Sequence, residues 1–138
     1  MCGIAGVFGF HRQSVVDVDL IRRMNDSIIH RGPDGEGIRA GSGYALGHRR
    51  LAILDLAGGA QPMSLPDGKL WLTFNGEIYN HRELRAELEE SGATFKTNSD
   101  SEVLLHGYRA WGTGLAAKLR GMFAFVIVVL SDLSEQPR

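Results

Sequence analysis

The chain carries its only cysteine at position 2, directly after the initiator methionine, in the stretch MCGIAGVFG. If Met1 is removed, a thiol and an α-amine, with ordinary pKa values of about 8.5 and about 8, lie on one residue. Such an amine can act as the base that activates its own side chain, so that the thiolate attacks an amide carbonyl and forms a thioester. The alternative is that Cys2 is a small buried residue on a strand, the commoner fate of a lone cysteine.

A nucleophile of this kind needs hydrogen-bond donors for the negative charge that develops on the carbonyl oxygen. Asn75 and Gly76 are candidates, because they follow an apolar stretch and offer a side-chain amide and a backbone N–H that can be approached closely. The alternative interpretation is a turn that ends a strand, since Asn-Gly is a common turn dipeptide.

A substrate that is an amino acid or its amide also needs a cation for its carboxylate and an anion for its ammonium group. Arg49 and Arg50 can supply a bidentate clamp for the carboxylate, and Asp100 can pair with the ammonium. The alternatives are solvated arginines and a carboxylate that favours the dipole of a helix.

The composition is that of one globular domain in a reducing compartment. The 138 residues are 43% hydrophobic, enough for a core, and 15 basic against 16 acidic residues give no electrostatic case for nucleic acid or an anionic membrane. No internal disulfide can form, no signal peptide is recognisable, and the longest apolar run, 122–130, is too short to span a bilayer. The five histidines show no metal-ligand spacing. We therefore expect a cytoplasmic protein without a metal site.

Strands and helices that could position these residues follow from the apolar periodicity. Strands are predicted at 2–10, 44–48, 51–56, 61–65, 69–74 and 122–130. Helices are predicted at 18–29, from the cap at 80 to the glycine at 92, at 99–111 and at 115–119, with a loop at 30–37. The run 122–130 is apolar on both faces, which predicts a strand sandwiched between layers. This order indicates a layered α+β architecture.

Three helix starts carry capping signals. Asp17 is placed to cap the first helix. Asn80 with Glu83, and Ser99 with Glu102, have the spacing of capping boxes, in which each side chain bonds the other residue's backbone N–H.

Seven motifs follow one another in order from the first residue to about residue 125. They are MCGIAGVFG at 1–9, HRGPDGEG at 30–37, LGHRRLAILDL at 46–56, GGAQPM at 58–63, FNGEIYNHRELRAEL at 74–88, TNSDSEVLLHGYRAWG at 97–112 and LRGMFAF at 119–125. With these motifs the sequence closely resembles the class II glutamine amidotransferases. Within them it is most similar to the glutaminase domain of the glutamine-hydrolysing asparagine synthetases.

The resemblance implies the N-terminal-nucleophile hydrolase fold, a four-layer αββα sandwich of the α+β class. Cys2 matches the nucleophile, and Asn75 and Gly76 match the oxyanion hole. Arg50 matches the residue that holds the glutamine carboxylate, and Glu77 and Asp100 match acidic contacts to the amino-acid end of the substrate. The positions that line the same pocket are matched by Leu51 and Ile53.

The implied reaction is the hydrolysis of L-glutamine to glutamate and ammonia through a thioester on Cys2, a step that needs no cofactor. In the family the ammonia serves the ATP-dependent amidation of aspartate by a second domain, which also uses magnesium and carries an adenylate-binding loop. No such loop occurs in these 138 residues.

The expected organisation is a partial glutamine amidotransferase domain at 2–130 and a tail at 131–138, with the fold incomplete at its C-terminus and the synthetase domain absent. A separate synthetase module or a second chain is then the expected partner besides glutamine. Two alternatives stay open. The chain is an inactive remnant or partner-binding module, or it is a glutaminase that serves another acceptor.

Overall fold

The computed structural model describes residues 1–9, 15–52 and 59–130. Its strands are β1 (Gly3–Phe8), β2 (Gly35–Gly41), β3 (Tyr44–Arg50), β4 (Met63–Ser64), β5 (Leu70–Ile78) and β6 (Gly121–Val129). Its helices are α1 (Val18–Ser27), α2 (His81–Glu90), α3 (Asp100–Trp111) and α4 (Leu115–Lys118), with short 3-10 turns at Ile29–Arg31 and Gly112–Gly114.

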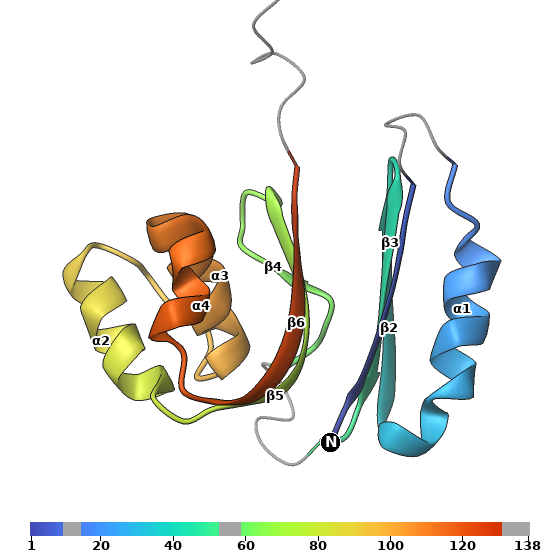
Figure 1. The fold of residues 1–138 in the computed structure, drawn as a ribbon, viewed down its shortest axis with the longest axis horizontal. Coiled ribbons are helices and arrows are strands. Elements are labelled where there is room, and N and C mark those ends of the chain that lie inside the picture. The colour runs from blue at the N-terminus through green and yellow to red at the C-terminus, as the bar shows by residue number, and fades with distance from the viewer. Residues whose placement is uncertain (10–14, 53–58, 131–138) are drawn as a thin grey trace, which may run out of the picture.

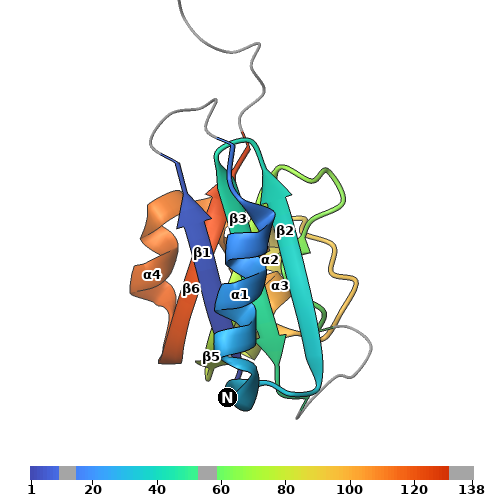
Figure 2. The same ribbon diagram turned by 90° about the vertical axis from the view of Figure 1, so that its right-hand side faces the viewer.

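Two antiparallel sheets face each other in the described part of the chain. The first has the strand order β1-β3-β2 and the second the order β4-β5-β6. Helix α1 covers the outer face of the first sheet, and α2, α3 and α4 cover the outer face of the second (Figure 1). Turning the molecule by 90° places α1 in front of β1, β3 and β2 (Figure 2). The layers therefore run helix, sheet, sheet, helix, as expected.

Helix α1 is fixed to the first sheet by a buried polar anchor. Asp17 caps the helix by accepting the Asp19 N–H at 2.9 Å, as predicted. From β3, Arg49 reaches the end of the helix, where its Nε donates to the Asn25 carbonyl at 3.1 Å and its Nη2 to Asp26 at 2.6 Å. The same Nη2 pairs with Glu36 of β2 at 2.9 Å. Arg49 therefore joins α1, β3 and β2.

The main apolar core lies between the second sheet and its helices. Leu72 and Phe74 of β5 share one buried cluster with Leu88 of α2 and Leu104 of α3. Since alternate residues of a strand point to opposite faces, the residues between them on β5 point toward the first sheet. This alternation leaves the inner face of β5 for polar contacts between the sheets.

Among the described residues, hydrogen bonds from Thr73 and from His48 cross from one sheet to the other. The Thr73 hydroxyl donates to the Gly47 carbonyl at 3.1 Å. His48 Nε2 lies 3.1 Å from the Phe74 carbonyl oxygen, and because a carbonyl only accepts, this nitrogen carries the hydrogen. Both bonds are buried and lie just before Asn75 on β5.

Two strands differ from the prediction. Gly35–Gly41 forms β2, although 30–37 was expected to be a loop, because a hairpin through Ser42 and Gly43 pairs this segment with β3. Asn75 and Gly76 do not end a strand in a turn, since β5 continues through them to Ile78 and pairs with β6. Of the predicted strand 51–56, residues 51 and 52 are not in a strand and the remainder lies outside the described residues.

Neither predicted capping box forms. Asn80 donates to the Lys118 carbonyl and accepts the Arg120 N–H, both at 2.9 Å, and so ties the start of α2 to the entry of β6. Ser99 does cap α3, by accepting the Ser101 N–H at 3.1 Å. Glu102, however, accepts backbone N–H groups of the preceding loop instead of closing the box.

The strand at the end of the described chain is only partly covered. Met122, Phe123 and Val129 of β6 are exposed, so the expectation that both faces are buried along the whole run is wrong. The physical reason is that, in the described residues, β6 pairs on one side only and lies at the edge of its sheet. None of the described helices combines the length and apolar character that crossing a membrane requires.

We predict that Arg49→Met lowers the free energy of unfolding by about 1–3 kcal/mol, because it leaves the Asn25 carbonyl and two carboxylates without their partner. Urea denaturation checks this. The control is Arg22→Met, which removes an ion pair between two largely exposed side chains and should change stability by less than about 0.5 kcal/mol. Equal losses in the two variants would contradict the anchor role.

Candidate active site

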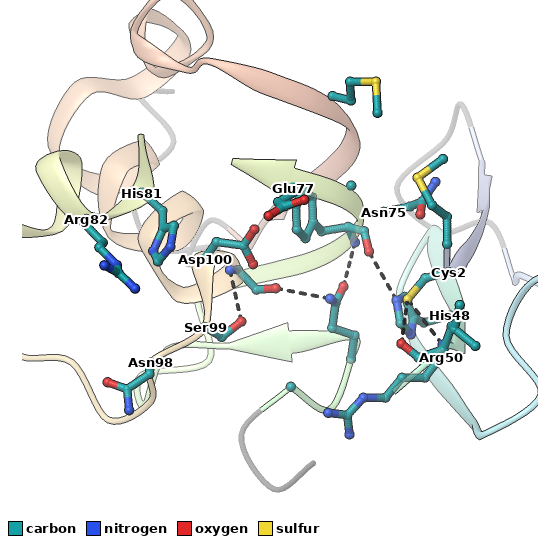
Figure 3. Close-up of a pocket in the computed structure, with 18 residues that line it drawn as sticks. Cys2, His48, Arg50, Asn75, Glu77, His81, Arg82, Asn98, Ser99 and Asp100 are labelled. Carbon is teal, nitrogen blue, oxygen red and sulfur yellow. Dashed lines mark hydrogen bonds between the residues drawn. The ribbon is translucent and has the colours of Figure 1, made fainter. Parts of the chain in front are cut away.

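A cavity of about 620 Å³ lies where the facing sheets meet the start of α3. It brings together every described residue to which the family resemblance gave a role, namely Cys2, Arg50, Leu51, Asn75, Gly76, Glu77 and Asp100. Ile53 lies outside the described residues. Figure 3 shows Cys2, His48 and Arg50 on one side, Asp100 and Ser99 on the other, and Asn75 between them. The volume of the cavity suits a small metabolite.

The Cys2 thiol is held by backbone contacts to the segment that follows β3. Its sulfur accepts the Leu51 N–H at 3.4 Å and lies 3.8 Å from the Leu51 carbonyl oxygen. The Cys2 carbonyl accepts a hydrogen bond from Arg31 Nε at 3.1 Å. Met1 is 61% exposed, whereas Cys2 is half-buried.

The loop that supplies Arg31 also supports the Arg50 end of β3. A side chain at Gly32 would overlap the backbone between Arg49 and Arg50, so only glycine allows this close approach. Asp34 donates its N–H to the Arg50 carbonyl at 3.0 Å and accepts the Ala52 N–H at 2.9 Å. The loop therefore holds both Cys2 and the segment around Arg50 in place.

The possible oxyanion donors lie on the inner face of β5. Thr73 bonds across to the first sheet, and Asn75, two residues later, points to the same side. Gly76 has φ +145°, and a Cβ there would overlap the Met122 carbonyl oxygen and the Phe123 backbone of β6. Glycine is therefore required at position 76 by both conformation and space, for a reason other than the expected turn.

Asp100 presents a carboxylate from the first turn of α3. Burial raises the pKa of Asp100, and the hydrogen bond from the Ile78 N–H, 3.1 Å long, opposes this rise. A buried anion of this kind is stabilised by a cation placed beside it. The pocket can thus accept a cationic group at Asp100, with the more exposed Glu77 on its rim.

His48 is buried in the pocket wall and neutral at physiological pH. The pKa of His48 is lowered from 6.5 to about 4, chiefly by burial; the hydrogen bond to the Phe74 carbonyl opposes this shift, and the positive charge of Arg50 contributes to it. As a neutral donor His48 holds the Phe74 peptide in place. It introduces no second positive charge beside Arg50.

Sequence reasoning missed several residues that shape the site. Arg31, His48 and Gln61 were given no role, although HRGPDGEG, LGHRRLAILDL and GGAQPM, which contain them, were singled out as motifs. Arg49, considered as half of a carboxylate clamp, points to α1 instead. Only Arg50 of the pair lines the pocket.

The arrangement suits acyl transfer from the amide of a small amino acid. It combines a thiol, a side-chain amide and a backbone N–H on the facing strand, a guanidinium and a buried carboxylate in one cavity. These are the groups that attack a carbonyl, stabilise the oxyanion and bind the two charged ends of an amino acid.

Comparisons with known proteins agree with this chemistry. A family described as the glutamine amidotransferase domain matches residues 1–134. Asparagine synthetase [glutamine-hydrolyzing] 1 of Bacillus subtilis is 51% identical over 129 residues, which cover 92% of this chain and 20% of that protein. Asparagine synthetase [glutamine-hydrolyzing] 2 of Oryza sativa is 42% identical over 97% of this chain and 22% of its own length. The chain therefore spans about a fifth of these curated relatives.

A solved structure shares the fold. Glutamine phosphoribosylpyrophosphate amidotransferase from B. subtilis, complexed with ADP and GMP, superposes with a TM-score of 0.73 at 26% identity, over 94% of this chain and 35% of that one. The αββα sandwich is thus the fold of the N-terminal-nucleophile glutamine amidotransferases.

The buried His48 predicts an acid-sensitive fold. Between pH 6.5 and about 4 the unfolded chain binds a proton at His48 that the folded chain does not, so the free energy of unfolding falls as the pH is lowered through this window. We expect His48→Gln, which keeps a donor for the Phe74 carbonyl, to remove up to about 3 kcal/mol of this fall. Urea denaturation at pH 7, 5.5 and 4.5 compares the two proteins, and equal pH slopes would contradict the assignment.

Proposed function

The chain belongs to the glutamine amidotransferase family, and on that premise we propose that its pocket hydrolyses L-glutamine to glutamate and ammonia through a thioester on Cys2. The observation that carries the proposal is that Cys2, directly before β1 of the first sheet, shares a pocket with Asn75 and Gly76 on β5 of the second. Arg50 and Asp100 lie in the same pocket and suit an amino-acid substrate.

Removal of Met1 prepares the nucleophile in this proposal. The liberated α-amine of Cys2 takes the thiol proton, directly or through water, and Sγ attacks the δ-carbon of glutamine. The resulting ammonium returns the proton to the amide nitrogen, so that ammonia leaves and a glutamyl thioester remains. Water then adds to the thioester with the amine as base, and release of glutamate restores the thiol. No group outside the chain is needed besides glutamine and water.

The negative charge of both tetrahedral intermediates would be stabilised from β5. The Asn75 side-chain amide and the Gly76 N–H are the proposed donors, and a single donor of this kind contributes about 10²–10³ to kcat. The geometry at Gly76 supports this role, since its positive φ and its closeness to β6 exclude any side chain.

The two charged ends of glutamine would bind on either side of these donors. Arg50 is the proposed partner of the α-carboxylate, and Asp100 with Glu77 the partners of the α-ammonium. The raised pKa of Asp100 supports this assignment, because a substrate ammonium would offset the cost of keeping that carboxylate charged and buried. Leu51 would complete the wall, and Ile53 is proposed for the same wall from the family resemblance alone.

The use of the ammonia is a second part of the proposal. The similarity to glutamine-hydrolysing asparagine synthetases favours the amidation of aspartate, with ATP and magnesium bound by a synthetase portion, in the same or a second chain, that these 138 residues do not include. The structural likeness to phosphoribosylpyrophosphate amidotransferase keeps a different acceptor as the alternative. A reactive lone thiol fits the reducing cytoplasm as the proposed compartment.

We expect the purified chain to release glutamate from glutamine, and Cys2→Ala to reduce this release to background, because no other thiol is present. An enzymatic glutamate assay measures the rate, and mass spectrometry after reaction with a diazoketone analogue of glutamine shows whether Cys2 is labelled. A chain extended before Met1, so that the amine stays blocked, is the control and should be inactive. Equal release by wild type and Cys2→Ala would overturn the proposal.

Arg50 and its neighbour offer a matched pair of variants. Arg50→Lys keeps the charge but loses the bidentate geometry, so we expect KM for glutamine to rise about 10–100-fold with a smaller effect on kcat. Arg49→Lys changes a side chain that points to α1, and should leave KM within about twofold. Steady-state kinetics distinguishes them, and a KM that rises equally in both would remove the argument for Arg50 as the carboxylate partner.

A further inference from the structure

Two side chains bond the backbone N–H and carbonyl of Phe74, the residue before the proposed oxyanion donors. Its N–H donates to the side-chain oxygen Oε1 of Gln61 at 2.6 Å, and its carbonyl accepts from His48 Nε2 at 3.1 Å. The N–H belongs to the peptide plane before Phe74 and the carbonyl to the plane after it. The second plane includes the Asn75 nitrogen, so these two bonds fix the backbone orientation from which the chain continues into Asn75 and Gly76.

The short length of β4 explains why a side chain is needed here. Only Met63 and Ser64 pair with β5, opposite Leu72 and Trp71. Continuing this register by two residues would place Gln61 opposite Phe74, but the ladder has already ended. The carboxamide of Gln61 therefore supplies the acceptor that a longer β4 would have supplied, and Phe74, which is 4% exposed, is not left with an unpaired N–H.

The other end of the same carboxamide reaches α3. Gln61 Nε2 donates to the Ser101 hydroxyl at 3.2 Å, and Ser101 is 2% exposed. The adjacent residue, Asp100, accepts the Ile78 N–H at 3.1 Å. The segment between Phe74 and Ile78, which contains the proposed oxyanion donors, is thus linked on both sides to the first two residues of α3.

We propose that Gln61 is a positioning residue for the oxyanion donors, which it sets at a fixed distance from the carboxylate that would bind the substrate ammonium. The inference rests on the proposed function and adds to it a residue with no role in the nucleophilic or charge-binding groups. Gln61 acts through the Phe74 peptide. Asp100 keeps its own bond to Ile78, so loss of Gln61 disturbs the oxyanion donors more than substrate binding.

A carboxamide suits the position for a reason of charge as well as of hydrogen bonding. It accepts from an N–H at one end and donates to a hydroxyl at the other. A glutamate could accept from both groups, since the Ser101 hydroxyl can reorient, but its negative charge would lie near the place where the oxyanion develops. Gln61→Glu therefore tests the charge, and the nearly isosteric Gln61→Met tests the hydrogen bonds.

Steady-state kinetics of glutamine hydrolysis is the first measurement. We expect Gln61→Met to lower kcat about 10–100-fold, the size of effect that misplacing a catalytic group by about 1 Å produces, with KM within about threefold. Gln61→Glu should lower kcat at least as much. Ser64→Ala, which removes only a local hydroxyl bond on β4, is the matched control and should leave kcat within about twofold.

Two further measurements separate positioning from a general loss of structure. An aldehyde analogue of glutamine, whose adduct with Cys2 carries an oxygen in the oxyanion position, should bind Gln61→Met more weakly by the same factor as the fall in kcat/KM. Alkylation of Cys2 by iodoacetamide develops no oxyanion, so its rate should stay unchanged. A parallel loss of alkylation would show disruption of the whole site and overturn the inference.

A double-mutant cycle with Asn75→Ala tests whether Gln61 acts through the oxyanion donors. In the Asn75→Ala background Gln61→Met should lower kcat by less than a third of the factor by which it lowers kcat in the wild type, and equal factors would overturn the inference.

If Gln61→Met does not fold, Ser101→Ala takes its place, because it removes only the hydrogen bond between Gln61 and α3. Ser101→Ala should lower kcat about 3–10-fold, and an unchanged kcat in this variant would overturn the inference. A wild type that releases no glutamate would overturn the proposed function itself, whereas an active wild type with an unaffected Gln61→Met overturns this inference alone.

Discussion

The hydrogen bond from His48 to the Phe74 carbonyl crosses from the first sheet to the second one residue before Asn75. Together with the bond from Thr73 to Gly47, it fixes the separation of the two sheets. The Cys2 thiol lies directly before β1 of the first sheet, and the proposed oxyanion donors lie on β5 of the second. Because the link is buried, the imidazole stays neutral and can serve as a donor without adding charge beside Arg50. The width of the pocket between Cys2 and Asn75 therefore depends on these two bonds.

Close backbone contact is the second constraint, and it explains why glycine occurs at two positions of the sequence motifs. At Gly32 the approaching chain is the backbone around Arg50, and at Gly76 it is β6. In each case a single Cβ would separate two segments that the site requires in contact. Gly32 of HRGPDGEG and Gly76 of FNGE thus have a steric role. Asp34, two residues after Gly32, bonds to the segment that this glycine admits, and Arg31 bonds to the Cys2 carbonyl.

The sequence predicted the elements that have a strong apolar period, and it predicted the types of residue that chemistry needs. Helices α1 and α3 and the pocket residues Cys2, Arg50 and Asp100 could be found in this way. Strand β2 could not, because a glycine-rich stretch has little periodicity and becomes a strand only through pairing with β3.

Side-chain partners were the least predictable part of the site. Glu102 has capping-box spacing from Ser99, yet it bonds to Lys96 and Thr97 of the loop before the helix, and the Ser99 N–H donates to the Thr97 hydroxyl instead. Asn80 likewise bonds to the entry of β6. Tertiary contacts of this kind depend on which segments the fold brings together, and spacing along one helix carries no information about them.

The hydrogen bond from Arg31 to the Cys2 carbonyl has a consequence for the entropy of the reaction. Chain termini ordinarily fray, and a nucleophile on a fraying end would have to be immobilised anew in every catalytic cycle. Here the first residue after Met1 is anchored through its carbonyl, and its sulfur contacts Leu51. The conformational freedom of the proposed nucleophile would therefore be lost once, when the chain folds, and not again in each turnover.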